Sequence, residues 1–248
     1  FSSIISCRKI LTGSDLLIGF GGYVSAPAYL AARTLRIPIV IHEANAKPGW
    51  ANKVGAIFTP HLAVAHPVER GRFSNALLAG LPLRSDVAAA YEYASKDWTL
   101  ARSQAKTRLG FKPTVPLIFV MGGSQGSVAI NAVIENCLDQ FQKHGYSVLH
   151  SVGGLNQLPA SSHEYQAVSY IDQMADAYLA ADLVISRSGA VTCSEFRALG
   201  RYALFVPLPI GNGEQMVNAT SLVVAGRARV IDQKQFTATY IKENIVQL

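Results

Sequence analysis

Short apolar segments alternate with helical patterns along almost the whole chain, and this alternation constrains the fold more than any other feature. DLLIGF (15–20) and PIVIHE (38–43) have the length and apolar content of buried strands, and APAYLAARTL (26–35) between them has a helical pattern. Strands that alternate with helices indicate βαβ units and therefore parallel sheets. The sequence predicts an α/β fold built from doubly wound sheets.

The alternation falls into two series, separated by a polar stretch around residues 84–112. The first series ends with LAVAH (62–66) and ALLAG (76–80), and the second begins with PLIFVMGG (116–123). A chain of 248 residues, 50% of them hydrophobic, is long enough to bury two cores. We therefore expect two Rossmann-like domains, residues 1–83 and 84–248, with an amphipathic helix over 97–109 after the boundary.

The basic charge of the chain is concentrated in its first third. Residues 1–83 hold eight Lys or Arg against three Asp or Glu, whereas residues 84–248 hold fourteen against thirteen. A basic surface can face nucleic acid, an anionic membrane or a phosphorylated substrate, and charge alone does not distinguish these from an ordinary solvated surface. The longest uncharged segment, residues 113–134, is interrupted by GGSQGS, so it indicates a strand, a loop and a helix rather than a membrane span.

The cysteines carry little functional signal. Cys7, Cys137 and Cys193 are scattered, odd in number and without a C-x-x-C spacing. This pattern argues against a disulfide framework or a zinc site and is typical of buried thiols in a reducing compartment. We expect no metal site from them.

Two glycine-rich loops each follow a predicted strand and precede a predicted helix. They are GFGGYVSAP (19–27) and MGGSQGS (121–127). Ligands of parallel sheets bind beyond the carboxyl ends of the strands, where the amides of a helix start can hold an anion. The first loop departs from the dinucleotide fingerprint at Val24, and the second lacks the G-K-[ST] ending of a P-loop. Tight packing of helix on strand remains the alternative for both, while Ser124 and the amides around it could hold a diphosphate.

Two later segments add polar groups at helix starts. In RSGAVTCSE (187–195), Glu195 lies in the second turn of a helix whose start suits an anion, so a ligand with both phosphates and hydroxyls, such as a nucleotide, accounts for both features. In PLPIGNGEQMVNA (207–219), Gln215 and Asn218 share a helix face. Their amides suit sugar hydroxyls, although such residues are also ordinary helix caps.

Six segments, in this order and spacing, resemble the MurG family of glycosyltransferases. They are GFGGYVSAPAYLAA, IPIVIHEANAKPGWANK, VMGGSQGS, YIDQMADAY, RSGAVTCSE and FVPLPIGNGEQMVNA. This family transfers N-acetylglucosamine from UDP-N-acetylglucosamine to lipid I, undecaprenyl-diphosphate-linked N-acetylmuramyl pentapeptide, and so makes lipid II for peptidoglycan. The resemblance implies a GT-B fold, in which an acceptor domain (1–83) and a UDP-sugar domain (84–248) face a cleft. It also implies an inverting reaction without cofactor or metal.

The resemblance implies site residues as well, by position in the matching segments. For the donor, these are Arg84 and the backbone of Ile171 at the uracil, Ser124 at the diphosphate, Glu195 at the ribose hydroxyls, and Gln215 and Asn218 at the sugar. The segment along the nucleotide comprises Ala190, Val191, Thr192, Cys193, Ser194 and Glu195. In the acceptor domain, Gly21, Gly22, Tyr23 and Ser25 would meet the lipid I diphosphate. Asn45 would lie at the cleft with the candidate catalytic residues His42 and Glu43, of which His42 has a structural hydrogen-bonding role as its alternative.

The chain departs from the family pattern in two ways. Glu214 stands where many members have glutamine, which would alter a sugar contact. The family's first strand and its glycine-rich, histidine-bearing loop have no counterpart here, nor do its last helices. We therefore expect domains that are incomplete at both ends of the chain. A non-catalytic UDP-sugar-binding module is the alternative function, and a GT-B-like UDP-N-acetylglucosamine epimerase is a weaker third because it leaves GFGGYVS unexplained.

The resemblance implies a peripheral location on the cytoplasmic face of the bacterial cell membrane, and no nucleic-acid partner. The basic first third and the apolar and basic segment KPGWANKVGAIF (47–58) predict a patch that rests on an anionic leaflet. A core helix with a solvated edge is the alternative for that segment.

Overall fold

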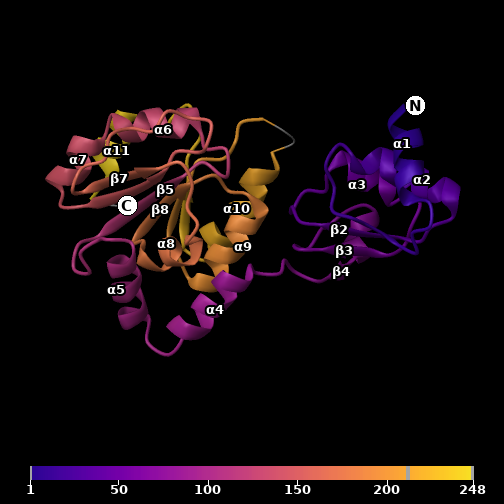
Figure 1. Cartoon of the computed structure of the whole chain (residues 1–248), viewed down its shortest axis with the longest axis horizontal. Helices are drawn as coiled ribbons and strands as arrows, with labels where there is room; N and C mark the ends of the chain where they lie inside the picture. The colour runs from indigo at the N-terminus through magenta and orange to yellow at the C-terminus, as the bar shows by residue number, and fades with distance from the viewer. Residues whose placement is uncertain (1, 211–212, 247–248) are drawn as a thin grey trace. The chain divides into compact units, whose positions relative to one another are not determined.

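The computed structural model describes residues 2–210 and 213–246, and the chain folds into two compact units. The first unit comprises Phe1–Pro82 and Gly211–Asn218, and the second comprises Leu83–Ile210 and Ala219–Leu248. Each unit contains a sheet with helices packed on it (Figure 1). The expected α/β fold class is confirmed, because every strand pairing in both sheets, over the described residues, is parallel.

The first unit has a four-stranded sheet in the order β1-β2-β3-β4. Its strands are β1 (Leu17–Gly19), β2 (Ile39–Glu43), β3 (Leu62–Val64) and β4 (Leu77–Leu78). Its helices are α1 (Ser2–Leu11), α2 (Ser25–Leu35), α3 (Trp50–Gly55) and the 3-10 turn η1 (Arg72–Asn75). The strands and α2 confirm the predicted elements, whereas α1 was not expected, and none of its residues is buried.

The core of the first unit is built around Tyr29 of α2. A Cβ atom on Gly19 would lie 2.0 Å from the Tyr29 hydroxyl oxygen, and one on Gly55 would lie 2.5 Å from the Tyr29 ring. Both positions therefore require glycine, because the ring occupies the space that a side chain would need. This packing draws β1, α2 and α3 together and positions the glycine-rich loop that follows β1.

The second unit has a six-stranded sheet in the order β10-β9-β8-β5-β6-β7. Its strands are β5 (Leu117–Met121), β6 (Ser147–Ser151), β7 (Tyr165–Val168), β8 (Leu183–Ser186), β9 (Ala203–Phe205) and β10 (Ala228–Val230). Its helices are α4 (Ser85–Ala94), α5 (Trp98–Arg108), α6 (Val128–Glu135), α7 (Leu138–Lys143), α8 (Met174–Ala180), α9 (Ala190–Leu199), α10 (Glu214–Val224) and α11 (Ala238–Asn244). The first turn of α10 belongs to the first unit.

Successive residues of β5 point to opposite faces of the second sheet, and each face is covered. Phe119 belongs to a core cluster with Tyr178 and Phe196, whereas Ile118 belongs to a second cluster with Ile134. All five residues of β5 are buried. Strands buried on both faces are typical of a doubly wound sheet.

The stretch before α5 differs from the sequence prediction. We expected a polar linker there, but residues 85–94 form α4, whose Val87 and Ala94 are wholly buried in the core of the second unit. The helix is hard to recognise because its contact face is made largely of alanine, which gives little hydrophobic contrast. The polar stretch is therefore part of the second unit rather than a linker.

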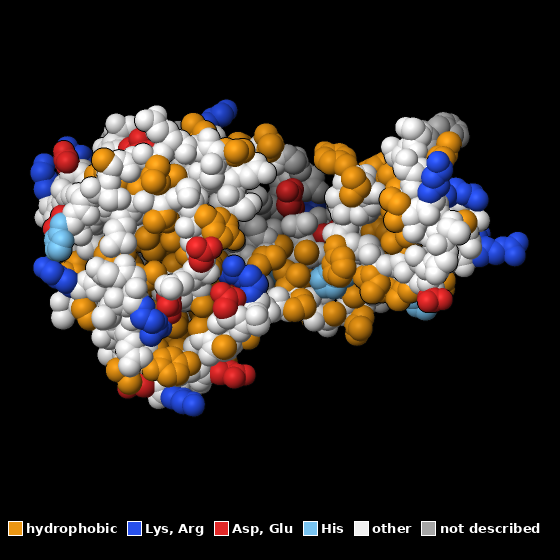
Figure 2. All heavy atoms as spheres, viewed as in Figure 1, with side chains coloured by type: hydrophobic (Ala, Val, Ile, Leu, Met, Phe, Trp, Pro, Cys, Tyr) orange, Lys and Arg blue, Asp and Glu red, His pale blue; other side chains and the backbone are white. Residues whose placement is uncertain are grey.

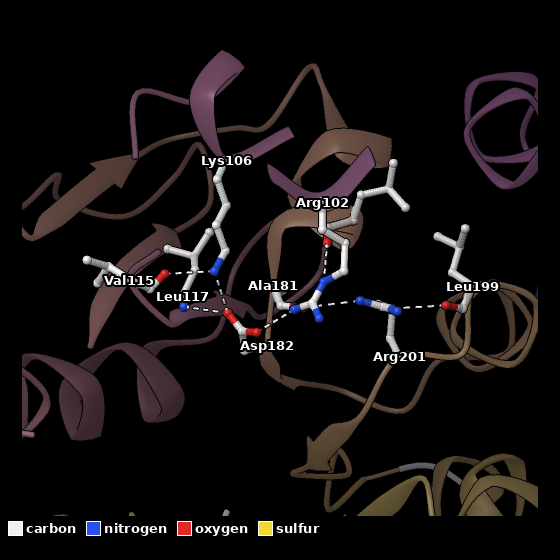
Figure 3. Close-up of polar contacts among 9 residues, drawn as sticks. Arg102, Lys106, Val115, Leu117, Ala181, Asp182, Leu199 and Arg201 are labelled. Carbon is white, nitrogen blue, oxygen red and sulfur yellow. Dashed lines mark hydrogen bonds and ion pairs between the residues drawn. The ribbon is translucent and has the colours of Figure 1, made fainter. Parts of the chain in front are cut away.

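A cluster of charges fixes α5 to the amino ends of β5 and β8 (Figure 3). Asp182 Oδ2 accepts hydrogen bonds from Lys106 Nζ and from the backbone N–H of Leu117, both at 2.8 Å. Arg102 also pairs with Asp182. Arg102 and Arg201 donate to carbonyl groups at the carboxyl ends of α8 and α9, where cations are favoured. The cluster thus stabilises the edge of the sheet opposite to the carboxyl edge.

Candidate functional site

The carboxyl edge of the second sheet gathers the glycine-rich loop 122–127 and the start of α9. The loop follows β5, and α9 follows β8, which is the neighbour of β5 in the sheet. Ser124 is exposed in the loop, and Ser127 caps the start of α6. The first N–H groups of a helix have no partner within it and attract anions. Two such helix starts therefore lie at adjacent strands.

Glu195 and Arg84 form an ion pair at this edge. Arg84 donates from Nε to Glu195 Oε1 at 2.7 Å and from Nη2 to Oε2 at 3.2 Å. The Glu195 side chain is only 2% exposed, whereas that of Arg84 is 41% exposed. Two residues that the sequence assigned to one nucleotide are thus brought together, although they lie 111 positions apart. A ribose that reaches Glu195 must share its carboxylate with Arg84.

Tyr178 completes the surroundings of this ion pair. The Arg84 Cζ atom lies 5.9 Å from the centre of the Tyr178 ring. Burial raises the pKa of the Tyr178 phenol, and Glu195 beside it raises that pKa further, so the hydroxyl keeps its proton. Burial alone would lower the pKa of Arg84, but its bond to Glu195 raises the pKa overall. Arg84 is therefore charged in this contact, and Tyr178 was not identified from the sequence.

Arg187 connects three strand ends at the same edge and was not assigned a role from the sequence. Its Nη2 donates to Ser127 Oγ at 2.8 Å and to Gln233 Oε1 at 2.6 Å, and its Nη1 donates to the Val206 carbonyl at 2.8 Å. These acceptors are neutral, so they leave the positive charge uncompensated. Burial lowers the pKa of the Arg187 guanidinium, although it stays protonated. Its charge adds to the positive potential of the two helix starts.

The segment 190–195 is not uniformly available to a ligand. Val191 is exposed, and Thr192 and Ser194 are half-buried. Ala190 is nearly buried, and Cys193 is wholly buried in the core, where burial raises the pKa of its thiol to about 12. Helical periodicity turns the Cys193 side chain into the core, so of this residue only the backbone is available to a ligand.

Ile171 is also buried. Its side chain is 7% exposed and packs in the same core as Phe119. Only its backbone remains available to a ligand, as the family resemblance implies.

In the first unit, Glu43 organises the loop after β2. Its Oε1 accepts from the backbone N–H of Asn45 at 2.9 Å and from Asn45 Nδ2 at 3.2 Å, and its Oε2 accepts from Gly49 N and Asn52 Nδ2, both at 2.9 Å. The residue is 2% exposed. Because four donors surround the carboxylate, it has no open position for a substrate proton. The geometry favours a structural role for Glu43.

His42 presents a different arrangement. Its Nε2 lies 2.8 Å from the carbonyl oxygen of Gly80, so Nε2 carries a proton and donates to that carbonyl. Within residues 2–210 and 213–246, Nδ1 is buried and has no hydrogen-bond partner. The His42 ring lies 5.8 Å from the ring of Phe20, measured between their centres. His42 is therefore an imidazole oriented by the Gly80 carbonyl, next to the glycine-rich loop.

A pocket of about 510 Å³ in the first unit brings several predicted acceptor residues together. It is lined by Phe20, Gly21, Gly22, Tyr23, Glu43, Asn45, Lys47, Gly49, Trp50, Ala51, Asn52 and Glu214. Gly21 and Gly22 have φ values of 90° and 85°, which favour glycine, and the hydroxyl of Ser25 donates to the Gly21 carbonyl. Tyr23 is 94% exposed at the rim. His42 does not line the pocket, although its ring contacts that of Phe20, which does. Asn52 was missed from the sequence.

Gln215 and Asn218 lie on α10, one turn apart, as predicted. Asn218 is 1% exposed, and its Oδ1 accepts from the backbone N–H of Ala46 at 3.0 Å while its Nδ2 donates to Asn45 Oδ1 at 3.3 Å. These bonds tie Asn218 to the loop that Glu43 organises. Gln215 is half-buried.

The described residues contain neither a metal-binding cluster nor a membrane-spanning helix. Among them, no group of three or more His, Cys, Asp or Glu side chains has the arrangement of a metal site. No helix of the described residues has both the length and the apolar character needed to cross a bilayer.

Comparisons with known proteins agree with this geometry. The chain matches the glycosyltransferase family 28 C-terminal domain over residues 117–248 and the family 28 N-terminal domain over residues 6–63. It is 42% identical over 241 residues to a Streptomyces coelicolor protein and 44% identical over 233 residues to one from Corynebacterium glutamicum. Both are named UDP-N-acetylglucosamine–N-acetylmuramyl-(pentapeptide) pyrophosphoryl-undecaprenol N-acetylglucosamine transferase. The matches cover 95% and 93% of this chain but only 64% and 63% of those relatives.

Solved structures give the same result for the fold. The crystal structure of Acinetobacter baumannii MurG matches with a TM-score of 0.72 and 28% identity, over 98% of this chain and 68% of that one. A UDP complex of Staphylococcus aureus MnaA matches with a TM-score of 0.64, 12% identity and coverage of 98% of this chain and 71% of that one, which shows likeness of fold alone.

Proposed function

Because the chain belongs to glycosyltransferase family 28, we propose that it transfers N-acetylglucosamine from UDP-N-acetylglucosamine to lipid I and so forms lipid II. The curated relatives of this sequence are named for that transfer. The observation that carries the proposal is the carboxyl edge of the second sheet, where loop 122–127, the start of α9, Arg187 and Glu195 suit the phosphates and ribose of one nucleotide.

The donor part of the reaction rests on this edge. Ser124 and the amides of two helix starts bind the diphosphate of the donor, and the uncompensated charge of Arg187 favours the same anion. These groups stabilise the negative charge that develops on UDP as it leaves, without reorganisation during the reaction. Glu195 accepts hydrogen bonds from the ribose hydroxyls, and Gln215 binds the sugar.

The acceptor part rests on the first unit. The hydroxyl oxygen of the acceptor sugar attacks the anomeric carbon of the donor, the bond from that carbon to UDP breaks, and the configuration inverts. His42, whose imidazole the Gly80 carbonyl orients, takes the hydroxyl proton. Because its Nδ1 is buried, this transfer requires the segment around Phe20 to move first. Glu43 holds the loop that carries Asn45, and Gly21, Gly22, Tyr23 and Ser25 bind the lipid I diphosphate. Since lipid I is a membrane lipid, the proposal includes peripheral binding of the chain at the cytoplasmic face of the cell membrane.

A UDP-sugar-binding module is the second candidate, and one observation favours it. Both candidate catalytic groups are buried, since Glu43 is 2% exposed and Nδ1 of His42 is buried. The two candidates share the donor site and differ in turnover. Transfer of radiolabelled N-acetylglucosamine to a short-chain lipid I analogue therefore distinguishes them, and loss of that transfer in His42→Ala with donor binding retained supports His42 as the base.

Donor binding is tested by calorimetry with UDP and 2′-deoxy-UDP. Glu195→Ala should weaken UDP binding about thirtyfold, because a charge-assisted pair of hydrogen bonds is lost. The unaltered chain should prefer UDP to 2′-deoxy-UDP, and Glu195→Ala should not. Glu164→Ala, at an exposed residue of the second unit, is the control and should bind UDP normally. Equal affinity of the unaltered chain for both nucleotides would remove the ribose role of Glu195.

A further inference from the structure

The loop after β6, residues 152–156, packs directly on the glycine-rich loop after β5. A Cβ atom on Gly126 would lie 1.8 Å from the carbonyl oxygen of Val152, and one on Gly153 would lie 2.3 Å from the carbonyl carbon of Gln125. Both glycines have positive φ values, 75° and 93°. Neither glycine position has room for a side chain, because the backbones of the two loops are in contact there.

Asn156 joins the two loops with one amide group. Its Nδ2 donates to the carbonyl oxygen of Gln125 at 3.0 Å and to that of Val152 at 2.7 Å. Both hydrogens of this nitrogen are thus used, one on each loop. The backbone N–H of Asn156 also donates to the Gly153 carbonyl at 3.1 Å, which closes its own loop into a turn.

The Val152 carbonyl is held from the other side by a buried network. Asn131 Nδ2 donates to it at 2.9 Å, and Asn131 Oδ1 lies 3.0 Å from Nε2 of His150. Asn131 and His150 are both buried. These hydrogen bonds fix loop 152–156 to the core of the second unit. Through its bond to the Gln125 carbonyl, Asn156 in turn fixes loop 122–127 to loop 152–156.

We propose that Asn156 is a positioning residue that holds loop 122–127 in the shape needed to bind the diphosphate of the nucleotide. The proposal rests on the proposed nucleotide-binding function. A loop of glycine and serine loses much conformational entropy when it closes on a ligand, and preorganisation reduces that loss. Asn156 preorganises the loop through its carbonyl groups and leaves the amides and Ser124 to the phosphates. Neither the glycine-rich motif nor the family resemblance pointed to it.

The test compares UDP with uridine, which lacks the phosphates. In Asn156→Ala, UDP should bind about five- to tenfold more weakly, as expected for two neutral hydrogen bonds, while uridine affinity should stay unchanged. Asn156→Asp replaces the donor by an acceptor that faces two carbonyl oxygens, so its UDP affinity should fall further. Asn136→Ala is the matched control, because its amide donates to a single carbonyl, that of Ala132, at the end of α6.

A second measurement needs no ligand. Amide hydrogen exchange in residues 122–127 should be faster in Asn156→Ala than in the unaltered chain or in Asn136→Ala. Equal exchange, or an equal loss of affinity for UDP and uridine, would overturn the proposal. If the unaltered chain binds neither UDP nor uridine, the proposed function fails, and with it the ligand part of this inference. The exchange rates still report whether Asn156 holds the loop.

Discussion

At the scale of single residues, burial keeps the imidazole of His150 uncharged. It is wholly buried, and burial lowers its pKa from 6.5 to about 4. Asn131 uses its Nδ2 on the Val152 carbonyl, so its Oδ1 accepts from His150 Nε2–H. His150 Nδ1 consequently accepts from the hydroxyl of Tyr165 at 3.0 Å. A proton on Nδ1 would disrupt this network.

We therefore expect acid to destabilise the second unit through His150. Between pH 6.5 and about 4, the unfolded chain binds a proton that the folded chain excludes. Above pH 6.5, protonation of His150 does not reduce the free energy of unfolding. As the pH falls toward 4, the free energy of unfolding decreases by up to about 3 kcal/mol because of this residue. Urea unfolding at several pH values checks this, with His150→Gln as the comparison. The stability gap between the two proteins should narrow as the pH falls, and a constant gap would contradict the assignment.

The residues of the candidate site differ in how far sequence could predict them. Glu195 was identified because its position in the helix is local, but its pairing with Arg84 joins residues 111 positions apart and leaves no local pattern. Arg187 lies inside a motif that we singled out, yet its role depends on contacts with Ser127 and Gln233 from distant segments. The motif also did not indicate that the Cys193 side chain lies in the core, because a motif names residues without saying which way a helix turns them.

At the scale of elements, the attachment of α5 depends on one carboxylate. Lys106 has a side chain only 7% exposed and relies on Asp182 for its countercharge. Burial alone would raise the pKa of Asp182, but Lys106, the Leu117 amide and Arg102 lower it overall, so the carboxylate remains ionised. Removing it leaves a buried ammonium without an anionic partner in this cluster.

Asp182→Asn should therefore destabilise the second unit by about 2 to 3 kcal/mol and speed hydrogen exchange in α5. Asp176→Asn is the matched control. Asp176 pairs with Arg108, whose side chain is 45% exposed, so its loss should cost less than about 1 kcal/mol. Urea unfolding measures both. Equal losses in the two variants would show that burial of the remaining cation, Lys106 or Arg108, does not matter here.

Elements with strong local signals were the ones predicted well. The helix expected to begin in RSGAVTCSE is found as α9 (Ala190–Leu199), because glycines at 189 and 200 bound it. The two-residue strand β4 was found from a short apolar run, but α4 and α1 were missed. The face of α4 that packs on the core is largely alanine, which gives little contrast between an apolar and a polar face. In α1 no residue is buried.

At the scale of the whole molecule, the uneven charge and the exposed apolar side chains of the first unit bear on membrane binding. Figure 2 shows apolar side chains on its surface, and those of Phe20, Tyr23, Val24 and Trp50 are 65–94% exposed. The segment 47–58 adds Lys47 and Lys53. An apolar surface with basic residues beside it favours an anionic bilayer.

We expect the chain to float with vesicles that contain anionic lipid and to dissociate as salt rises. Lys53→Gln should weaken binding about fivefold, because one basic residue near the surface contributes about 1 kcal/mol. Lys112→Gln, at an exposed lysine of the second unit, is the control and should bind as the unaltered chain does. Binding that ignores both salt and lipid charge would contradict this expectation.

The direct contact of the two loops at Gly126 and Gly153 also limits how a lineage can diverge. Each glycine lies against the backbone of the other loop, so neither position can acquire a side chain on its own. Gly154 has open space around it and carries no such restriction. A substitution at either glycine then requires a compensating change in the other loop. Sequences that descend from this one should therefore keep both glycines or change them together.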